Sequence, residues 1–311
     1  MTGVTSRPGK RSREVALGIA IGVLADRVFG DPSRLHPVAG MGQLAGALEK
    51  QLYRDTRGAG LGFALTCLTA SAATGLALRR GGALAVGVAV WSTLGGTTLC
   101  KIGDRMADAL EQGDIAAARA LVPSLCGRDP AALDDAGICR ATIESVAENT
   151  SDAAVGPLVA AAFAGAPGVL AYRMVNTLDA MVGYRTPRYE RFGWASAKLD
   201  DAANLIPARL SGLLAAALSG SPGRALRTWR DDAHHHPSPN AGVVEAAFAG
   251  ALGFSLGGTT IYPTHVEERP VLGAGAYPTV DDLRAAVALS RRVQYAAAAL
   301  SVGVTLCRMV D

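Results

Sequence analysis

Charged residues are scarce in this sequence. Asp, Glu, Lys and Arg make up 18% of its 311 residues, against about 25% in an ordinary soluble domain, whereas 50% are hydrophobic. This shortage is typical of a protein embedded in a lipid bilayer. The 30 Lys and Arg nearly balance the 27 Asp and Glu, and aromatic residues are only 5% of the chain. Because basic stripes and stacking aromatics are both lacking, we expect no nucleic acid among the partners.

Several common enzyme signatures are also missing. The sequence contains no GxxxxGK[ST], no GxGxxG on a strand, no HExxH and no GxSxG, which excludes the standard P-loop, Rossmann, zincin and hydrolase interpretations. Cysteines are few and form no CxxC pair, and three of them lie in or against apolar segments. We interpret them as buried thiols in a reducing compartment rather than as disulfides or zinc ligands. They are Cys67, Cys100, Cys126, Cys139 and Cys307.

Long apolar runs are what the sequence does contain. A transmembrane helix needs about 20 mostly apolar residues, and the segments 61–78 and 81–100 fit this requirement. Only Arg79 and Arg80 separate them, so they predict a helical hairpin whose basic tip favours the cytoplasmic side. Weaker candidates are rich in Ala and Gly, which allow close helix packing. They are 15–29, 153–172, 205–220, 241–258 and 295–309.

The N-terminal region has the basic start and short apolar run of a signal peptide. Asp26 and Arg27, however, stand where a cleavage site needs small residues. We therefore predict a flexible tail over 1–14 followed by a first membrane helix that is retained.

The whole pattern predicts an all-α fold, a single multi-pass helical integral membrane domain over 1–311. Between 101 and 150, apolar residues recur at helical spacing among charges, which predicts a small amphipathic helical insertion outside the membrane. Residues 259–290 predict a polar loop region. The segment 153–172 is interrupted by Gly and Pro, so we expect a broken or re-entrant helix that lines a cavity.

Three acids form the first polar cluster. Glu144, Glu148 and Asp152 are spaced four apart, so a helix would place them on one face. Like charges at this spacing repel by about 0.2–0.5 kcal/mol per exposed pair, and something positive should lie beside them. The pattern leaves two alternatives open: a solvated acidic face on which Arg140 pairs with Glu144, or a site for Mg²⁺ or a substrate amine.

A second cluster lies between two apolar segments, over 176–209. Ionisable residues between membrane segments usually face a cavity or pair with one another, although a charged loop that binds lipid headgroups is the alternative. Arginine and lysine here could hold phosphates, and the acids with Asn204 could hold a metal. Its polar residues are Asn176, Asp179, Arg185, Arg188, Tyr189, Arg191, Lys198, Asp200, Asp201, Asn204 and Arg209.

The third cluster contains three consecutive histidines, 234–236. Adjacent residues cannot all face one ion, so we expect a solvated turn rather than a zinc site. The following prolines exclude helix until about Asn240. Ser238 or Asn240 can then cap a helix that starts near Val243, with Glu245 in its first turn and N–H groups open to an anion.

A fourth polar turn follows the first apolar run. It contains Asp26, Asp31, Arg34 and His36.

Taken together, these polar turns resemble one known family. "DRVFGDPSRLHPV", "ESVAENTSDAAVGPL", "NTLDAMVGYR", "RYERFGWASAKLDDAANLIPARL" and "HPSPNAGVVEAAFAGALG" are similar to the CobD/CbiB family of cobalamin biosynthesis, the adenosylcobinamide-phosphate synthases. The similarity runs from about Leu17 to Gly258. It implies a multi-pass enzyme of the bacterial inner membrane with a cytoplasm-facing active site. The enzyme would join the propionate of adenosylcobyric acid to the amine of aminopropanol or its O-phosphate, giving adenosylcobinamide or its phosphate.

The resemblance also implies cofactors and partners. Forming an amide from a carboxylate needs activation, and the family is usually written as using ATP and Mg²⁺, although the sequence offers no nucleotide motif. Membrane lipid and other corrinoid-pathway enzymes are the expected partners. A non-catalytic membrane regulator or a corrinoid carrier is the alternative function.

The resemblance assigns a task to each polar cluster. It implies acid–base roles for Glu144, Glu148, Asp201 and His236, and metal ligation by Asp152 and Asp200. We expect the remaining polar residues to bind substrate, all in one shared pocket. They are Asn149, Asn176, Asp179, Arg185, Arg188, Tyr189, Lys198, Asn204, Ser238, Asn240, Asp31 and His36.

Overall fold

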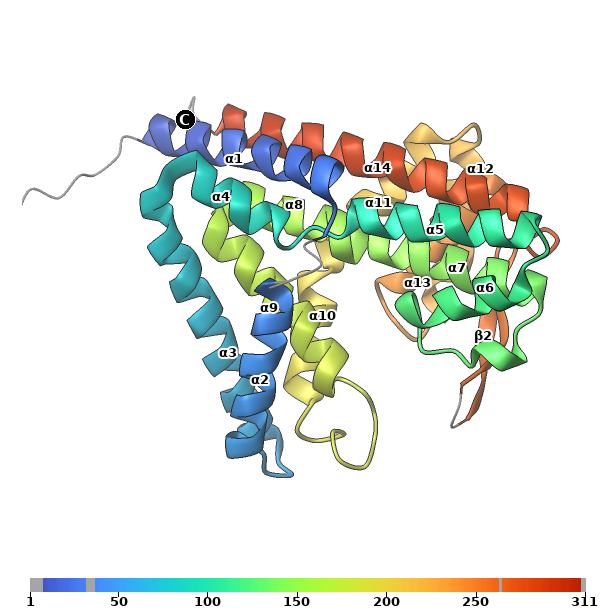
Figure 1. Cartoon of the computed structure of the whole chain (residues 1–311), viewed down its shortest axis with the longest axis horizontal. Coiled ribbons are helices and arrows are strands. Elements are labelled where there is room, and N and C mark those ends of the chain that lie inside the picture. Colours follow the sequence, from blue (N-terminus) through green and yellow to red (C-terminus); the bar gives the residue numbers. More distant parts are fainter. Residues whose placement is uncertain (1–7, 32–36, 263–264, 309–311) are drawn as a thin grey trace, which may run out of the picture. The chain divides into compact units, whose positions relative to one another are not determined.

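The computed structural model describes residues 8–31, 37–262 and 265–308, and it is mainly helical (Figure 1). The longer helices are α1 (Pro8–Phe29), α2 (Pro37–Leu52), α3 (Arg57–Leu78), α5 (Gly96–Glu111), α7 (Asp135–Thr150), α9 (Ala166–Val182), α11 (Leu205–Leu218) and α14 (Val280–Cys307). The shorter ones are α4 (Gly82–Trp91), α6 (Ile115–Leu121), α8 (Gly156–Ala164), α10 (Trp194–Ala203), α12 (Pro222–Asp232) and α13 (Ala241–Leu252).

The described chain divides into two compact units. Unit 1 comprises the described residues up to 95, 156–204 and from 297, and unit 2 comprises 96–155 and 205–296. Each unit therefore combines segments that are distant in sequence. The prediction of a single domain is not tested by this division and stays a prediction.

In unit 1, α1 packs closely against α4, and the two run side by side in Figure 1. Gly18 and Gly22, one helical turn apart on α1, face Val86 and Val90. A Cβ on Gly18 would lie 2.5 Å from the Val86 Cβ, so only glycine allows this approach. This spacing of small residues is the one that brings membrane helices into close contact.

The core of unit 1 lies where α3 packs against α9 and α10. Phe63 and Cys67 of α3 meet Met174 and Leu178 of α9, and Phe192 closes the cluster. All five side chains are fully buried. In unit 2, burial raises the pKa of the Cys139 thiol to about 12. The prediction of buried thiols is confirmed for Cys67, Cys100 and Cys139, whereas Cys126 is half-buried and Cys307 is exposed.

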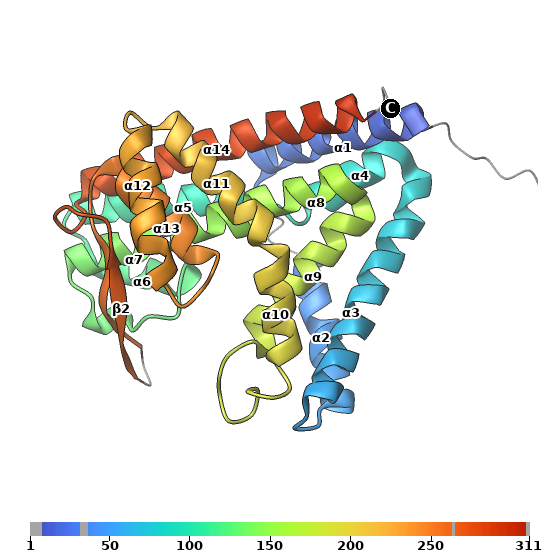
Figure 2. The same cartoon turned by 180° about the vertical axis from the view of Figure 1, so that it is seen from behind.

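In unit 2, α13 lies at the centre and packs against α7, α11 and α12 (Figure 2). Every residue from Ala241 to Ala251 is buried. At about 1.5 Å per residue, its 12 residues reach only about 18 Å, which is too short to cross the roughly 30 Å core of a bilayer. Of the segment 241–258, residues 241–252 form this buried helix and a strand begins at Leu256, so the segment is not the continuous membrane helix that hydropathy suggested.

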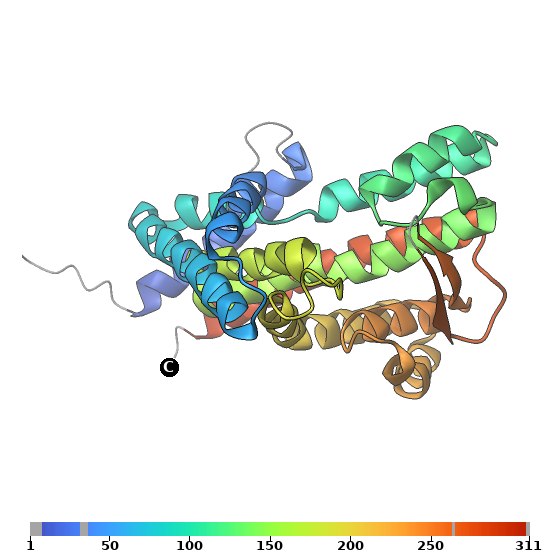
Figure 3. The same ribbon diagram turned by 90° about the horizontal axis from the view of Figure 1, so that it is seen from below.

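Two strands correct the prediction of a loop over 259–290. β1 (Leu256–Ile261) and β2 (Val266–Leu272) pair antiparallel, with Thr259 opposite Glu268 (Figure 3). The strands are short, and β2 carries charges and a proline, so the sequence pattern did not predict them. The loop ends at Thr279, whose Oγ1 accepts from the amide of Asp282 while the carboxylate of Asp282 accepts from the amide of Thr279. This capping box starts α14 at Val280.

The predicted flexible tail also needs correction. α1 begins at Pro8, so residues 8–14 are helical, and Lys10 lies 4.0 Å from Glu14 one turn later. Proline suits the first turn of a helix, where its missing N–H costs nothing. Residues 1–7 lie outside the described part of the chain.

The break predicted within 153–172 is confirmed. A π-helical turn over Ser151–Val155 leads into α8, and Gly165 then adopts a φ of 66° before α9 starts at Ala166. Glycine tolerates this left-handed conformation, and Pro167 suits the first turn of the new helix. The helical insertion predicted for 101–150 is likewise present as α5, α6 and α7.

Among the described residues, one helical stretch, Arg57–Glu111, is long and apolar enough to cross a membrane. The second arm of the predicted hairpin, 81–100, is not one helix: α4 ends at Trp91 and α5 starts at Gly96. The hydroxyls of Ser92 and Thr93 donate to carbonyls at the end of α4 and help to end it. The multi-pass membrane topology stays a prediction.

Candidate functional site

A buried ion pair anchors the polar centre of unit 2. Glu144 on α7 accepts a hydrogen bond from Arg128 at one carboxylate oxygen and, at 2.8 Å, from the amide of Gly257 on β1 at the other. The side chains of Arg128 and Glu144 are each 4% exposed. Both oxygens of Glu144 are thus engaged in holding α7 to β1.

Arg140 does not pair with Glu144, which corrects the first of the two alternatives for the acidic face. Its guanidinium donates instead to the backbone carbonyls of Gly257 and Thr259 and stacks over Tyr277. The partner of Glu144 comes from a loop that precedes α7, and not from the preceding turn of the same helix.

His236 and Glu245 form the second part of this centre. The Nε2 atom of His236 lies 3.8 Å from Oε1 of Glu245, and the two side chains are 4% and 2% exposed. The amide of Ser238 donates to Nδ1 of His236 at 3.0 Å. The carbonyl of Ser238 lies 3.3 Å from the same Nδ1. Because the contact with the amide is the shorter of the two, we assign Nδ1 as the acceptor and place the proton of the neutral ring on Nε2, facing Glu245.

Burial determines the protonation of this pair. It raises the pKa of Glu245 well above its ordinary value, and the nearby charges of Glu144 and Glu148 act in the same direction. Burial also lowers the pKa of His236. A buried pair whose acid holds its proton and whose base lacks one is neutral, so it avoids the cost of placing charges in a medium of low polarity.

Two cations border the pair. Arg128 and Arg269 both act electrostatically on Glu245, and Arg269 donates to the hydroxyl of Tyr262 at 3.0 Å. Within the described residues, Nη1 of Arg128, Nε of Arg269 and Nε2 of His236 are buried and have no hydrogen-bond acceptor, and Nε of Arg269 lies 3.6 Å from a carboxylate oxygen of Glu267. We define Arg128, Glu144, His236, Glu245 and Arg269 as the buried polar centre of unit 2; its free donors are of the kind that bind an oxygen with negative charge.

The structure therefore brings part of the first and third predicted clusters together. Glu148 lies on the exposed side of α7, yet its charge acts on Glu245, and Asp152 is half-buried in the π-helical turn that follows. Asn149 donates to the carbonyl of Ser145 one turn back. His234 and His235 are exposed and their rings lie against each other, 3.9 Å between centroids, so only His236 points inward.

The start of α13 differs from the prediction. The helix begins at Ala241, and the hydroxyl of Ser238 accepts from the amides of Asn240 and Ala241, so Ser238 is the capping side chain. Asn240 makes no cap; its side chain accepts from Arg209 at 2.7 Å. Glu245 is buried beyond the first turn, and the site has no open helix end of the kind predicted for an anion.

Asp200 organises a separate network in unit 1. Its two oxygens accept from the amides of Asn176, at 2.6 Å, and Asn204, at 3.0 Å, and Tyr172 donates to Asn204 in turn. Burial raises the pKa of Asp200, and the two amide hydrogen bonds oppose this shift. Asp201, next in sequence, pairs with the exposed Lys198 at 3.0 Å, so the two neighbouring acids have different partners.

Arg188 and Tyr189 meet an acid that the sequence analysis did not single out. Both donate to the same oxygen of Glu49 on α2, at 3.1 and 2.9 Å, and Arg188 also lies over the ring of Tyr53, 4.2 Å from its centroid. Arg185 is exposed in the same loop. The guanidinium of Arg188 is therefore already paired within unit 1.

The remaining predicted residues are more scattered. Asp179 is half-buried on α9 and Asp31 is half-buried after α1, whereas His36 and Arg34 lie outside the described residues. No group of three or more His, Cys, Asp or Glu side chains within the described ranges is arranged to hold a metal ion. Predicted site residues fall in both units: Glu144, Glu148 and His236 in unit 2, and Asp200 and Asp201 in unit 1.

Comparison with known proteins identifies the family. The profile described as CobD/Cbib protein matches residues 19–290, most of the chain. The chain belongs to the CobD/Cbib protein family. The resemblance found in the polar turns is thereby confirmed.

Relatives over nearly the whole length agree with this assignment. "Cobalamin biosynthesis protein CobD" of Mycobacterium tuberculosis (strain ATCC 25618 / H37Rv) is 54% identical over 296 residues, which cover 92% of this chain and 95% of the relative. Proteins of the same name from Geobacter metallireducens and Chromobacterium violaceum are 45% and 41% identical, over 84% and 94% of this chain and 87% and 97% of their own. No solved structure matches. The similarity supports a role for this CobD/Cbib protein in cobalamin biosynthesis.

Three members of the polar centre of this CobD/Cbib protein escaped the sequence analysis as site residues: Arg128, Arg269 and Glu245. Arg128 and Arg269 lie in segments without periodicity, so no pattern marks them. Glu245 did leave a signal, because it is the single charged residue in the apolar run "AGVVEAAFAGALG". A lone acid in a buried helix is costly to keep and usually has a partner.

Proposed function

We propose that this CobD/Cbib protein forms the amide bond between the propionate of adenosylcobyric acid and the amine of aminopropanol or its O-phosphate. The family supports the pathway, and the amide chemistry rests on one observation in particular. The buried pair of His236 and Glu245 holds a carboxyl of raised pKa beside an imidazole whose N–H faces it.

The reaction requires two proton losses from nitrogen. The amine is an ammonium ion at neutral pH and must lose a proton before its lone pair can attack the acyl carbon; the tetrahedral intermediate then loses a second. A carboxyl whose pKa is raised is, once deprotonated, a stronger base than an ordinary carboxylate. In this proposal Glu245 acts in its deprotonated form: the carboxylate, which faces Nε2–H of His236, takes the proton from nitrogen and becomes the neutral carboxyl that burial favours.

The acyl oxygen gains negative charge as the amine attacks. Arg128 and Arg269 supply buried donors without acceptors, and fixed donors of this kind lower the energy of an oxyanion. Glu144, with both oxygens engaged, keeps Arg128 in place. Glu144 is thus a positioning residue in this scheme, and Glu148, at the exposed side, is the acid placed to attract the ammonium.

ATP and Mg²⁺ remain part of the proposal because a free carboxylate does not react with an amine at a useful rate. Mg²⁺ is commonly held by one or two carboxylates together with substrate phosphates. The described residues do not form a metal cluster of their own, and both oxygens of Glu144 and of Asp200 accept hydrogen bonds. The residues present therefore do not by themselves fit a dedicated Mg²⁺ site, and the scheme assigns no step to the metal.

We also propose a bacterial membrane location, which the apolar stretch Arg57–Glu111 supports. Lipid and neighbouring corrinoid enzymes would then be the natural partners.

The decisive experiment is a conversion assay. Membranes that contain the chain receive adenosylcobyric acid, aminopropanol phosphate, ATP and Mg²⁺, and mass spectrometry follows the corrinoid. A product heavier by the amine minus one water supports the proposal, and free aminopropanol run in parallel shows which amine is preferred. Corrinoid that binds but never changes mass contradicts it and favours the carrier function.

A further inference from the structure

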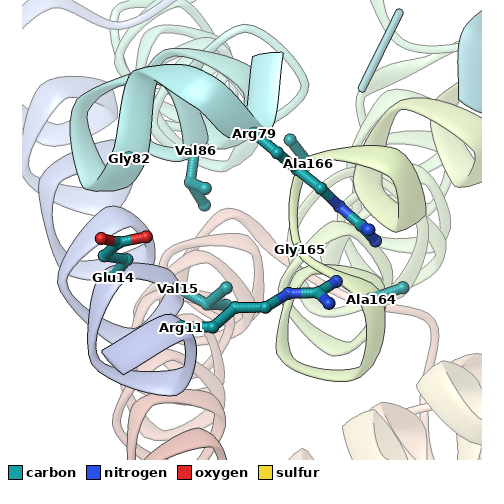
Figure 4. Close-up of a pocket in the computed structure, with 9 residues that line it drawn as sticks. All are labelled: Arg11, Glu14, Val15, Arg79, Gly82, Val86, Ala164, Gly165 and Ala166. Atoms are coloured by element: carbon teal, nitrogen blue, oxygen red, sulfur yellow. The ribbon is translucent and has the colours of Figure 1, made fainter. Parts of the chain in front are cut away.

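A polar pocket in unit 1 shares no residue with the clusters described above. It lies between the start of α1, the tip that joins α3 to α4, and the bend between α8 and α9 (Figure 4). Its volume is about 140 Å³, about ten times the space that one water needs. A small polyatomic ligand would fit.

Two arginines give the pocket its charge. Arg11 from α1 and Arg79 from the α3–α4 tip both line it, and their charges act on each other. Figure 4 shows both guanidinium groups on the side where α9 begins, whereas the carboxylate of Glu14 lies on the opposite side. Glu14 pairs with Lys10. Within the described residues, neither arginine side chain forms a hydrogen bond or an ion pair, so two like charges face one space without an acid between them.

The start of α9 adds positive potential at the same place. Gly165 and Ala166 line the pocket, and Gly165 is an N-cap without a side chain. Because Pro167 has no N–H, the amides of Ala166 and Gly168 are the ones in the first turn of this 17-residue helix that carry partial positive charge, which favours an anion.

The walls of the pocket are held by close packing. Gly18 brings α1 against Val86, which itself lines the pocket. Gly82, at a φ of 58°, makes the sharp turn that starts α4. The arginines therefore project from helices whose spacing is fixed, which reduces the ordering that a ligand would have to impose.

We propose that this pocket binds a phosphate group. Guanidinium groups form paired hydrogen bonds with phosphate oxygens, and two of them with a helix N-terminus match a doubly charged tetrahedral anion. The group could belong to a free phosphate or to the headgroup of an anionic lipid, since both present the same oxygens to the arginines.

The chain offers matched controls for a test. All four arginines concerned are exposed, so they are matched in accessibility. Arg11→Gln and Arg79→Gln each remove one guanidinium that lines the pocket, while Arg13→Gln and Arg80→Gln remove a neighbour that does not line it. In one arm, inorganic phosphate is titrated calorimetrically into the purified full chain in neutral detergent. In the other arm, native mass spectrometry counts phosphatidylglycerol or phosphatidylcholine that stays bound after extraction. Circular dichroism shows that each variant is folded.

The outcomes separate the two sources. Loss of one charged hydrogen bond weakens binding by about tenfold or more. The proposal is supported if both pocket variants lose affinity in this way while the control variants keep wild-type affinity. A loss of phosphate binding in the calorimetric arm identifies a free phosphate as the ligand. A loss seen only in the lipid arm identifies a lipid headgroup. No phosphate binding and no preference for phosphatidylglycerol, or an equal loss in the control variants, would overturn it.

Discussion

Glu245 lies with its Oε1 atom 3.8 Å from Nε2 of His236, and the amide of Ser238 donates to Nδ1 of the same ring at 3.0 Å. Both side chains are buried, and burial favours the neutral form of each. Their geometry therefore does not depend on an ion pair. A neutral side chain of the same shape should keep the fold while removing the ability to accept a proton.

Replacing Glu245 by Gln tests its role as a base. We expect Glu245→Gln to slow amide formation by about 10²–10⁴-fold, the usual contribution of a general base, while the melting temperature stays equal or rises. Glu268→Gln, on the exposed strand β2 where Glu268 accepts from Thr259, serves as control and should leave the rate unchanged. A Glu245→Gln enzyme with the wild-type rate would exclude Glu245 from the chemistry.

The same variant tests the pH dependence of stability. Burial raises the pKa of Glu245 in the folded protein above its ordinary value of 4.5, so the folded state holds the proton more tightly than the unfolded state. This contribution is fully present below the unfolded pKa and is lost as pH rises through the folded pKa. The free energy of unfolding of wild type should therefore fall, relative to Glu245→Gln, as pH rises above about 5. Unfolding curves for both proteins that stay parallel from about pH 5 to about pH 8 would contradict the shift.

The pair of Arg128 and Glu144 should matter for stability far more than a surface pair. Arg128→Met leaves a buried carboxylate without its cation, at a cost of about 3–5 kcal/mol, whereas removing both charges is often nearly neutral. Chemical unfolding of the single variants and of Arg128→Met with Glu144→Met measures this difference. Arg284→Met, which breaks an exposed pair with Asp108 and Glu111, should cost no more than about 1 kcal/mol. If Arg128→Met and Arg284→Met lowered the free energy of unfolding equally, the burial of Arg128 would make no difference to the stability that its ion pair contributes.

Local signals in the sequence predicted the helical class and the break in 153–172. Gly165 and Pro167 act through the conformation of their own backbone, so their effect can be read without the rest of the fold. The strands β1 and β2 could not be read in this way. Their pairing joins Leu256 to Leu272 across a turn, and β2 has only seven residues, three consecutive charged ones followed by a proline and two apolar ones, so it lacks the alternation that marks a strand.

The candidate site was predicted in part for a similar reason. Helical spacing predicted a helix that carries Glu144 and Glu148, which is present as α7, but it suggested Arg140 as the partner of Glu144, because that arginine precedes it by one turn. The true partner, Arg128, lies in a loop whose path depends on the packing of unit 2. Spacing along one helix indicates which side chains share a face, whereas a partner from another segment requires the tertiary structure.

The packing of α1 against α4 can be tested with two glycines. A Cβ on Gly18 would lie 2.5 Å from the Val86 Cβ and 2.9 Å from the carbonyl oxygen of Ala83, so Gly18→Ala forces the helices apart and should cost about 1–3 kcal/mol. Gly62, within α3, has no atom within 4 Å of the same position, so Gly62→Ala should be neutral or stabilise by up to about 1 kcal/mol through helix propensity. Thermal unfolding of the two variants side by side measures the difference. If Gly18→Ala were as stable as Gly62→Ala, α1 and α4 would not be in the close contact that frames the arginine pocket.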